Sequence, residues 1–186
     1  MRIIAGKWKG HSLKGPKSPL TRPTSDRLRE TIFNILNAYF MKNDISLDRL
    51  RVLDAFAGTG ALGLEALSRG AHSVTFIEKT TTACGVIREN INFLKAQSQC
   101  SLIQSDVLTL KASEIFSYDL LFVDPPYHQS LCEKALERFF EQGWLAKNAI
   151  IVVETDSSET LIFPEHFQLL DHRAVGRAGI WTLHFQ

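Results

Sequence analysis

The sequence has few of the features that mark secreted, membrane-spanning or metal-binding proteins. It has three cysteines in 186 residues, widely spaced and without a C-x-x-C pair, so neither a zinc site nor a disulfide framework is predicted. No apolar run approaches the roughly 20 residues of a membrane span, and the chain does not open with a signal-peptide pattern. We therefore expect a reduced, cytoplasmic protein, without a membrane or a metal, and monomeric.

The sequence also lacks internal repeats and low-complexity tracts, which argues against a repeat architecture. Hydrophobic residues make up 45% of the chain and charged residues 22%, both ordinary values for a globular protein. A length of 186 residues suits one domain with its own core, together with a short appendage.

The net charge is also small, at +1, but positive charge is concentrated at the N-terminus. Residues 1–29 contain eight lysines and arginines against one aspartate, so the rest of the chain is net negative. This asymmetry predicts a basic arm over residues 1–23 that contacts nucleic acid, followed by a domain over residues 24–186. The alternative is a solvated tail whose charge serves only solubility. The predicted RNA contacts are Arg2, Lys7, Trp8, Lys9, Arg22, Arg27 and Arg29, where Trp8 either stacks on a base or pins the arm to the domain.

Helical and strand patterns alternate along the predicted domain. A first helix begins near Thr24 and Ser25, and further helices are predicted over 61–69, 81–95, 107–115 and 131–140. Strands are predicted over 52–53, 73–77, 101–104, 118–123, 149–154, 167–175 and 180–185. This order indicates a doubly wound α/β sheet with an antiparallel element at its C-terminal end.

The motif Asp124-Pro125-Pro126-Tyr127 follows an apolar run that is typical of a buried parallel strand. Ligands bind beyond the carboxyl ends of such strands, so these four residues are the predicted catalytic group. The prolines have a fixed φ and no N–H donor, which gives a stiff loop whose carbonyls are free to accept hydrogen bonds. Acceptors beside an aromatic ring suit a flat substrate that bears an amino group, such as a nucleobase.

A glycine-rich stretch joins the first predicted strand to the following helix. Gly58-x-Gly60-x-x-Gly63 has the spacing of the dinucleotide fingerprint, and Glu78 lies where a ribose-binding acid belongs. A nicotinamide-dependent oxidoreductase is therefore one interpretation of this stretch.

Acidic residues favour a different cofactor. Asp54, Glu78, Asp106 and Asp124 end four consecutive predicted strands. Asp54 suits a ligand with an ammonium group rather than a pyrophosphate, and Asp106 offers an acceptor to an adenine amine. The set fits S-adenosyl-L-methionine. The predicted cofactor-binding residues are Asp54, Ala55, Phe56, Gly58, Gly60, Glu78, Lys79, Asp106, Val107 and Asp124.

The chain resembles the bacterial small-subunit rRNA guanine-N2 methyltransferases of the RsmD type. The resemblance rests on RIIAGKWKG at 2–10, RPTSDRLRETIFN at 22–34, DAFAGTGALGLEALSR at 54–69, FVDPPY at 122–127 and GWL at 143–145. The first two segments are particular to this family, whereas the glycine loop and D-P-P-Y occur in many amino-methyltransferases.

The resemblance implies a class I SAM-dependent methyltransferase fold: Rossmann-like, with a doubly wound seven-stranded sheet whose last strand is antiparallel. It also implies methylation of the exocyclic N2 amine of one guanine in small-subunit (16S) rRNA, as free rRNA or as a 30S particle. The D-P-P-Y motif would hold an amino group but does not specify which base carries it. N6-adenine methylation of DNA or RNA is therefore the alternative within the same chemistry. A non-catalytic RNA-binding assembly factor is an alternative of another class.

Overall fold

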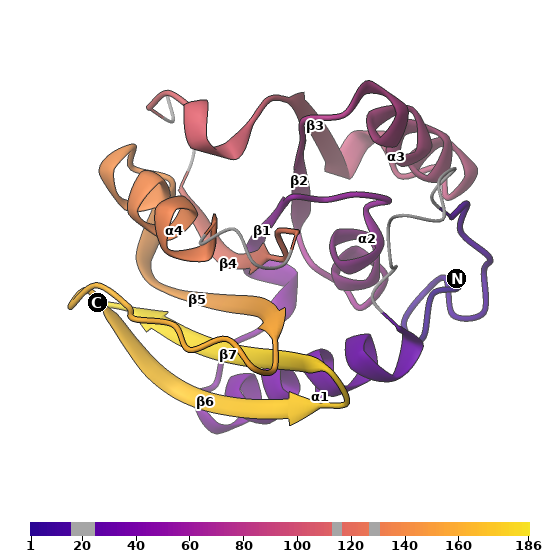
Figure 1. Cartoon of the computed structure of the whole chain (residues 1–186). Coiled ribbons are helices and arrows are strands. Elements are labelled where there is room, and N and C mark those ends of the chain that lie inside the picture. The colour runs from indigo at the N-terminus through magenta and orange to yellow at the C-terminus, as the bar shows by residue number, and fades with distance from the viewer. Residues whose placement is uncertain (16–24, 113–116, 127–130) are drawn as a thin grey trace.

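Seven strands form a mixed sheet at the centre of the protein, and the computed structural model describes residues 1–15, 25–112, 117–126 and 131–186. The strands are β1 (Arg51–Ala55), β2 (Ser73–Glu78), β3 (Cys100–Gln104), β4 (Tyr118–Val123), β5 (Leu145–Asp156), β6 (Phe167–Val175) and β7 (Ala178–Phe185). Their order across the sheet is β3-β2-β1-β4-β5-β7-β6 (Figure 1). Strands β1 to β5 pair in parallel, and β7 is antiparallel to both β5 and β6. This confirms the predicted doubly wound sheet with an antiparallel last strand.

Helices cover both faces of the sheet. They are α1 (Asp26–Lys42), α2 (Ala61–Ser68), α3 (Thr81–Phe93) and α4 (Leu131–Glu141). Side chains of α1, α2 and α3 build one hydrophobic cluster, and α4 builds the other on the opposite face (Figure 1). Among the described residues, no helix combines the length and apolar character that a membrane crossing requires.

The predicted helix over 107–115 is wrong in its described part. Only Val107–Thr109 form a helical turn, of the 3-10 type. The carbonyl oxygen of Leu108 accepts a hydrogen bond from Arg138 Nε (3.0 Å), and that of Lys111 accepts one from Trp144 Nε1 (2.9 Å). These carbonyls therefore bind side chains of later elements instead of extending a helical ladder.

Helix α1 begins where the sequence predicts. Ser25 is its N-cap, and its hydroxyl oxygen accepts a hydrogen bond from the Leu28 N–H (3.2 Å). Leu28, Ile32, Ile35 and Leu36 are buried on one face of the helix, and the ring of Phe33 lies 5.7 Å from that of Phe122, centroid to centroid. Helix α1 therefore packs over β4, the strand that leads to Asp124.

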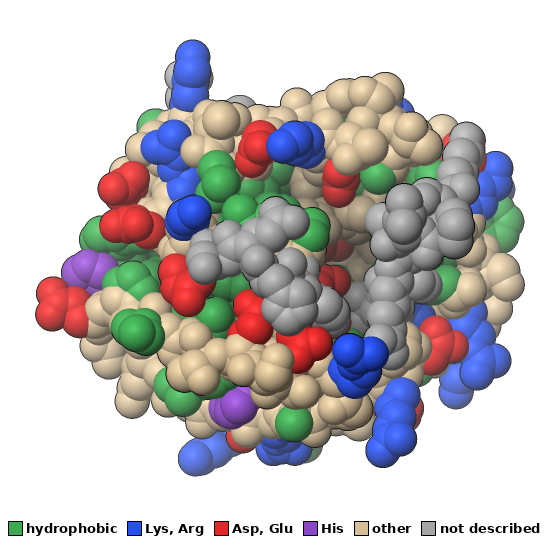
Figure 2. Space-filling view, viewed as in Figure 1, with side chains coloured by type: hydrophobic (Ala, Val, Ile, Leu, Met, Phe, Trp, Pro, Cys, Tyr) green, Lys and Arg blue, Asp and Glu red, His purple; other side chains and the backbone are tan. Residues whose placement is uncertain are grey.

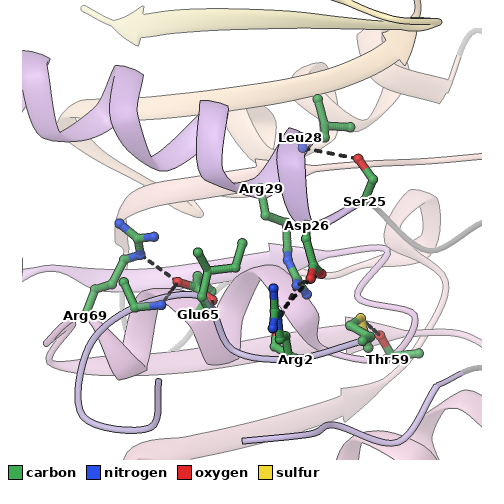
Figure 3. Close-up of polar contacts among 11 residues, drawn as sticks. Arg2, Ser25, Asp26, Leu28, Arg29, Thr59, Glu65 and Arg69 are labelled. Atoms are coloured by element: carbon green, nitrogen blue, oxygen red, sulfur yellow. Dashed lines mark hydrogen bonds and ion pairs between the residues drawn. The ribbon is translucent and has the colours of Figure 1, made fainter. Parts of the chain in front are cut away.

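Residues 1–15, here called the N-terminal segment, pack against α2, so this part of the predicted arm belongs to the domain. The buried Glu65 carboxylate accepts hydrogen bonds from the Ile4 N–H (2.8 Å) and the Ala5 N–H (3.0 Å). The Ser68 hydroxyl donates to the Ala5 carbonyl (2.6 Å) and accepts from the Trp8 N–H (3.0 Å). Figure 3 shows Glu65 on α2, and Arg69 just after this helix, beside the segment. Within the segment, Arg2 and Ser12 form an isolated antiparallel β-bridge.

Gly6 and Gly10 provide a matched test of this docking. Both have a left-handed φ, +82° and +85°, so replacement by alanine should cost each about 1–2 kcal/mol of backbone strain. A Cβ at Gly6 would lie 1.8 Å from the Ser68 carbonyl oxygen, whereas one at Gly10 would meet nothing within 4 Å. Gly6→Ala should therefore lose about 1–3 kcal/mol more unfolding free energy than Gly10→Ala in urea titrations. Equal losses would contradict the docked position.

Candidate cofactor and substrate site

The predicted acidic residues lie together at one edge of the sheet. Because β1 to β4 run parallel, their carboxyl ends share that edge. Figure 2 shows a hollow in the middle of this face with acidic side chains around it. The sheet therefore brings together the candidate residues that lie far apart in the sequence.

The loop that joins β1 to α2 has an unusual backbone. Phe56, Gly58 and Gly60 all have positive φ, at 60°, 56° and 77°. Such angles are costly for a residue with a side chain, so Phe56 is held by its surroundings rather than by preference. The Gly58 N–H donates to Glu78 Oε2 (2.9 Å), which ties the loop to the end of β2.

Glu78 is placed to meet a ligand. Its second oxygen, Oε1, accepts a hydrogen bond from the Thr80 N–H (2.7 Å), and the side chain is half-buried. Each carboxylate oxygen has a further lone pair, so Glu78 can accept from two ribose hydroxyls while it keeps both backbone donors.

Asp54 lies beneath the loop. It is 2% exposed, and its Oδ2 accepts a hydrogen bond from the Gly63 N–H in the first turn of α2 (2.8 Å). Burial raises the pKa of Asp54 well above its ordinary value, and the nearby carboxylates of Asp124 and Glu78 raise it further. In the structure Asp54 supports the loop through Gly63, and its contact with a ligand ammonium stays a prediction.

Asp106 and Lys79 form an ion pair at the end of β3. Asp106 Oδ2 accepts from Lys79 Nζ (2.9 Å), and Oδ1 accepts from the Leu108 N–H (3.0 Å). The Lys79 hydrogen bond, followed by that of the Leu108 N–H, lowers the pKa of Asp106. Asp106 is therefore an ionised acceptor next to the buried side chain of Val107.

The predicted catalytic motif begins directly after β4. Asp124 is half-buried, Pro125 is buried and Pro126 is exposed, whereas Tyr127 lies outside the described residues. Burial is the main cause of the raised pKa values of Asp54 and Cys132, and the charge of Asp124 raises both further. In the part of the chain that the structure describes, no group of His, Cys, Asp and Glu side chains could hold a metal ion. The acidic surroundings favour a cationic ligand over an anionic one.

The residues predicted to contact RNA differ in their exposure to solvent. Exposed positions are occupied by Arg2, Lys7, Lys9 and Arg27, and Arg22 lies outside the described residues. Trp8 is half-buried against the core, with Lys7 Nζ 4.1 Å from its ring centroid, which fits the alternative that Trp8 pins the arm.

Arg29 does not fit an RNA contact. Its side chain is 0% exposed, and its Nη2 donates to the Arg2 carbonyl (2.6 Å) and to Asp26 Oδ1 (2.7 Å). Burial lowers the pKa of its guanidinium. Arg29 thus attaches the N-terminal segment to α1, and we remove it from the RNA-binding set.

Sequence reasoning missed three residues that connect the site to the rest of the fold: Thr59, Glu65 and Asn90. Asn90 carried a usable signal, because it lies three residues after the inward-facing Ile87 and so interrupts an apolar helix face. Thr59 and Glu65 carried no comparable signal, since polar residues in a loop and on a helix are ordinary.

Comparisons with known proteins match almost the whole chain. The model of a family described as conserved hypothetical protein 95 matches residues 1–184. Ribosomal RNA small subunit methyltransferase D of Haemophilus influenzae is 39% identical over 95% of this chain and 89% of its own. The protein of that name from Escherichia coli K12 is 36% identical over 96% of this chain and 87% of its own.

Solved structures show the same architecture. The Escherichia coli protein yhhF has a TM-score of 0.84 at 34% identity, covering 100% of this chain and 98% of its own. An RNA methyltransferase of Salinibacter ruber, solved with S-adenosyl-L-homocysteine, has a TM-score of 0.64 at 16% identity, over 88% of this chain and 94% of its own. The second likeness shows the fold alone.

The buried carboxyl of Asp54 predicts a pH-dependent stability. Its pKa is higher in the folded than in the unfolded chain, so stability falls as the pH rises from the unfolded pKa to the folded one. Asp54→Asn keeps an acceptor for Gly63 and removes the charge. Its melting temperature should exceed that of the wild type at pH 8, by roughly 3 °C or more, and this advantage should shrink toward pH 4.

Asp119→Asn is the matched control, because the Asp119 carboxylate also accepts a backbone N–H, from Arg51 (2.8 Å), but at 29% side-chain exposure. It should gain no stability at high pH, since water reaches its carboxylate. A pH-independent loss of stability in Asp54→Asn would contradict the buried-charge argument.

Proposed function

The chain belongs to the family described as conserved hypothetical protein 95, and two relatives named ribosomal RNA small subunit methyltransferase D are 39% and 36% identical to it over nearly its whole length. We propose on this basis that it methylates small-subunit (16S) rRNA, with S-adenosyl-L-methionine as the donor and the exocyclic N2 amine of a guanine as the acceptor. One observation carries the proposal: Asp124-Pro125-Pro126 follows β4 beside a loop whose Gly58 N–H is bound to Glu78.

The residues present suit this cofactor. Glu78 would hold the ribose hydroxyls, and Asp106 would accept a hydrogen bond from the adenine amine, with Val107 beside the ring. When bound, S-adenosyl-L-methionine supplies an electrophilic methyl group on a sulfonium ion. The carboxylates of Asp124 and Glu78 favour that positive charge, and they would repel the pyrophosphate of a nicotinamide cofactor. The acidic site therefore argues against the oxidoreductase interpretation.

The catalytic motif would prepare the amine. The lone pair of an aromatic amine is delocalised into the ring, so the nitrogen is a poor nucleophile. Asp124 would accept a hydrogen bond from one N–H of this amine, and the carbonyl oxygen of Pro125 would accept one from the other N–H. Both acceptors favour a tetrahedral nitrogen and stabilise the positive charge that develops on it during transfer. Asp124 need not be a strong base, because the methylated ammonium is very acidic. Tyr127 would stack on the base.

The substrate would be held by cations outside this pocket. Arg2, Lys7, Lys9 and Arg27 are exposed, and Lys14 adds a further exposed amine in the N-terminal segment. Phosphate contacts of this kind give affinity and salt dependence, with little choice of sequence. A paired guanine must also leave its helix to reach Asp124. The preference for guanine N2 over adenine N6 rests on the relatives rather than on the motif.

The deciding experiment is labelled methyl transfer to small subunits from cells that lack this gene, followed by nucleoside analysis. A single N2-methylguanosine is the expected product. Label in N6-methyladenosine, from RNA or from DNA added in parallel, would show that the target is adenine N6 and not guanine N2. Absence of transfer to any of these acceptors would overturn the proposed activity.

Asp124→Asn should lower kcat by roughly 10²–10³-fold, because one preorganised acceptor of the reacting amine is weakened. Asp171→Asn is the control, since Asp171 lies on β6 at the far edge of the sheet, paired with Arg173. Its kcat should stay within the small range typical of surface substitutions. Wild-type kcat in Asp124→Asn would sink the mechanism.

The lysines of the N-terminal segment should govern the salt dependence of RNA binding. Replacing Lys7, Lys9 and Lys14 together by glutamine should lower RNA affinity and reduce the slope of log K against log salt by about 0.7–0.9 for each phosphate that is no longer neutralised. The same change at the exposed lysines Lys42, Lys95 and Lys147 is the control. Equal slopes in the two triple variants, measured by titration at several salt concentrations, would show that this segment does not contact phosphates.

A further inference from the structure

A single buried amide joins three separate parts of the chain. Asn90 lies on α3 and is 1% exposed. Its Oδ1 accepts from the Lys14 N–H (2.8 Å), and its Nδ2 donates to the carbonyls of Lys14 (3.2 Å) and Thr59 (3.1 Å). Both N–H groups of the amide and its oxygen are thus engaged. Asn90 therefore connects α3, the N-terminal segment and the loop that joins β1 to α2, which contains Thr59.

Thr59 is also contacted from the other end of the N-terminal segment. Its hydroxyl donates to Met1 Sδ (3.7 Å), a contact visible beside Thr59 in Figure 3. Thr59 lies between Gly58 and Gly60, and the Gly58 N–H holds Glu78. Movement of the N-terminal segment at Met1 or Lys14 would therefore move Thr59 and, through Gly58, the carboxylate predicted to bind the ribose.

The outer side of the same segment carries the cations. The Lys14 side chain is 67% exposed and lies 2.7 Å from Glu89 Oε2, while its backbone is fixed by Asn90. A phosphate bound to the lysine side chains of the N-terminal segment would favour the docked position of this segment. In that position the segment holds Thr59. Two ligands that stabilise one arrangement must raise each other's affinity by the same factor.

We infer that Asn90 is a positioning residue that couples RNA binding on the N-terminal segment to cofactor binding at the loop containing Thr59. This inference rests on the proposed function. It predicts that RNA and cofactor each raise the affinity of the protein for the other through the Asn90 amide. This effect is in addition to any direct contact between the two ligands in the pocket.

The test measures the dissociation constant of S-adenosyl-L-homocysteine with and without saturating small subunits from cells that lack this gene. The wild type should bind it roughly 5-fold or more tightly in their presence. In Asn90→Ala this ratio should fall, and only the part that comes from direct contact between the two ligands should remain. In turnover, Asn90→Ala should raise the KM for both substrates and leave kcat nearly unchanged, which marks a loss of uniform binding. A merely structural role would lower the active fraction, and so kcat, without changing the ratio.

Asn92→Ala is the matched control, because Asn92 is an exposed asparagine on the same helix and its side chain binds Gln97. It should keep the wild-type ratio. If Asn90→Ala does not fold, Asn90→Leu decides, since leucine has nearly the shape of asparagine, leaves no cavity and removes the hydrogen bonds to Lys14 and Thr59, so the ratio should fall in the same way.

A wild-type ratio of one, or an unchanged ratio in the variant that folds, would overturn the coupling. In either case methyl transfer by the wild type would leave the proposed function standing. Absence of methyl transfer would instead remove the proposed function, and the coupling with it.

Discussion

The hydrogen bond from the Gly63 N–H to the buried Asp54 carboxylate fixes the start of α2 against the sheet, and the candidate site depends on it. Helix α2 can approach so closely only because Gly63 has no side chain: a Cβ there would lie 2.5 Å from Phe76 Cε1 and 2.7 Å from Val74 Cγ1. The loop before α2 is thereby placed over β1 and β2, where the Gly58 N–H reaches Glu78. A contact within the core thus determines the geometry of the surface that would meet the cofactor.

The same short helix organises the N-terminal segment. Every residue of α2 is buried, because one side of the helix covers the sheet and the other is covered by residues 1–15. Glu65 is the centre of that second contact, with two backbone N–H donors and Arg69 Nε at 2.7 Å. A buried carboxylate with this number of donors is satisfied rather than strained. The loop proposed for the cofactor and the segment proposed for the RNA are therefore both positioned by one eight-residue helix.

Sequence reasoning located the sheet and the carboxylates at its edge because apolar periodicity and chain order determine both. It could not assign Arg29, since a basic residue in a basic segment has the same appearance whether it contacts phosphate or pairs with Asp26 inside the fold. It offered docking of the N-terminal segment only as an alternative for Trp8, because hydrogen bonds between backbone groups and Glu65 or Ser68 leave no periodic pattern. The short turn at 107–109 was overextended for a related reason: the carbonyls of Leu108 and Lys111 bind side chains that are distant in sequence.

Strand register explains why two aspartates in similar sequence positions take different roles. Asp54 pairs with Phe122 across β1 and β4, so Asp124 lies two residues farther along, about 7 Å nearer the ligand side. Asp54 is 2% exposed and holds Gly63, whereas Asp124 is half-buried and faces the position of the reacting amine in the proposed mechanism. Their proximity links them, because the charge of Asp124 raises the pKa of Asp54. Asp54 thus supports the loop through the Gly63 N–H, and Asp124, farther along the sheet edge, presents its carboxylate to the site.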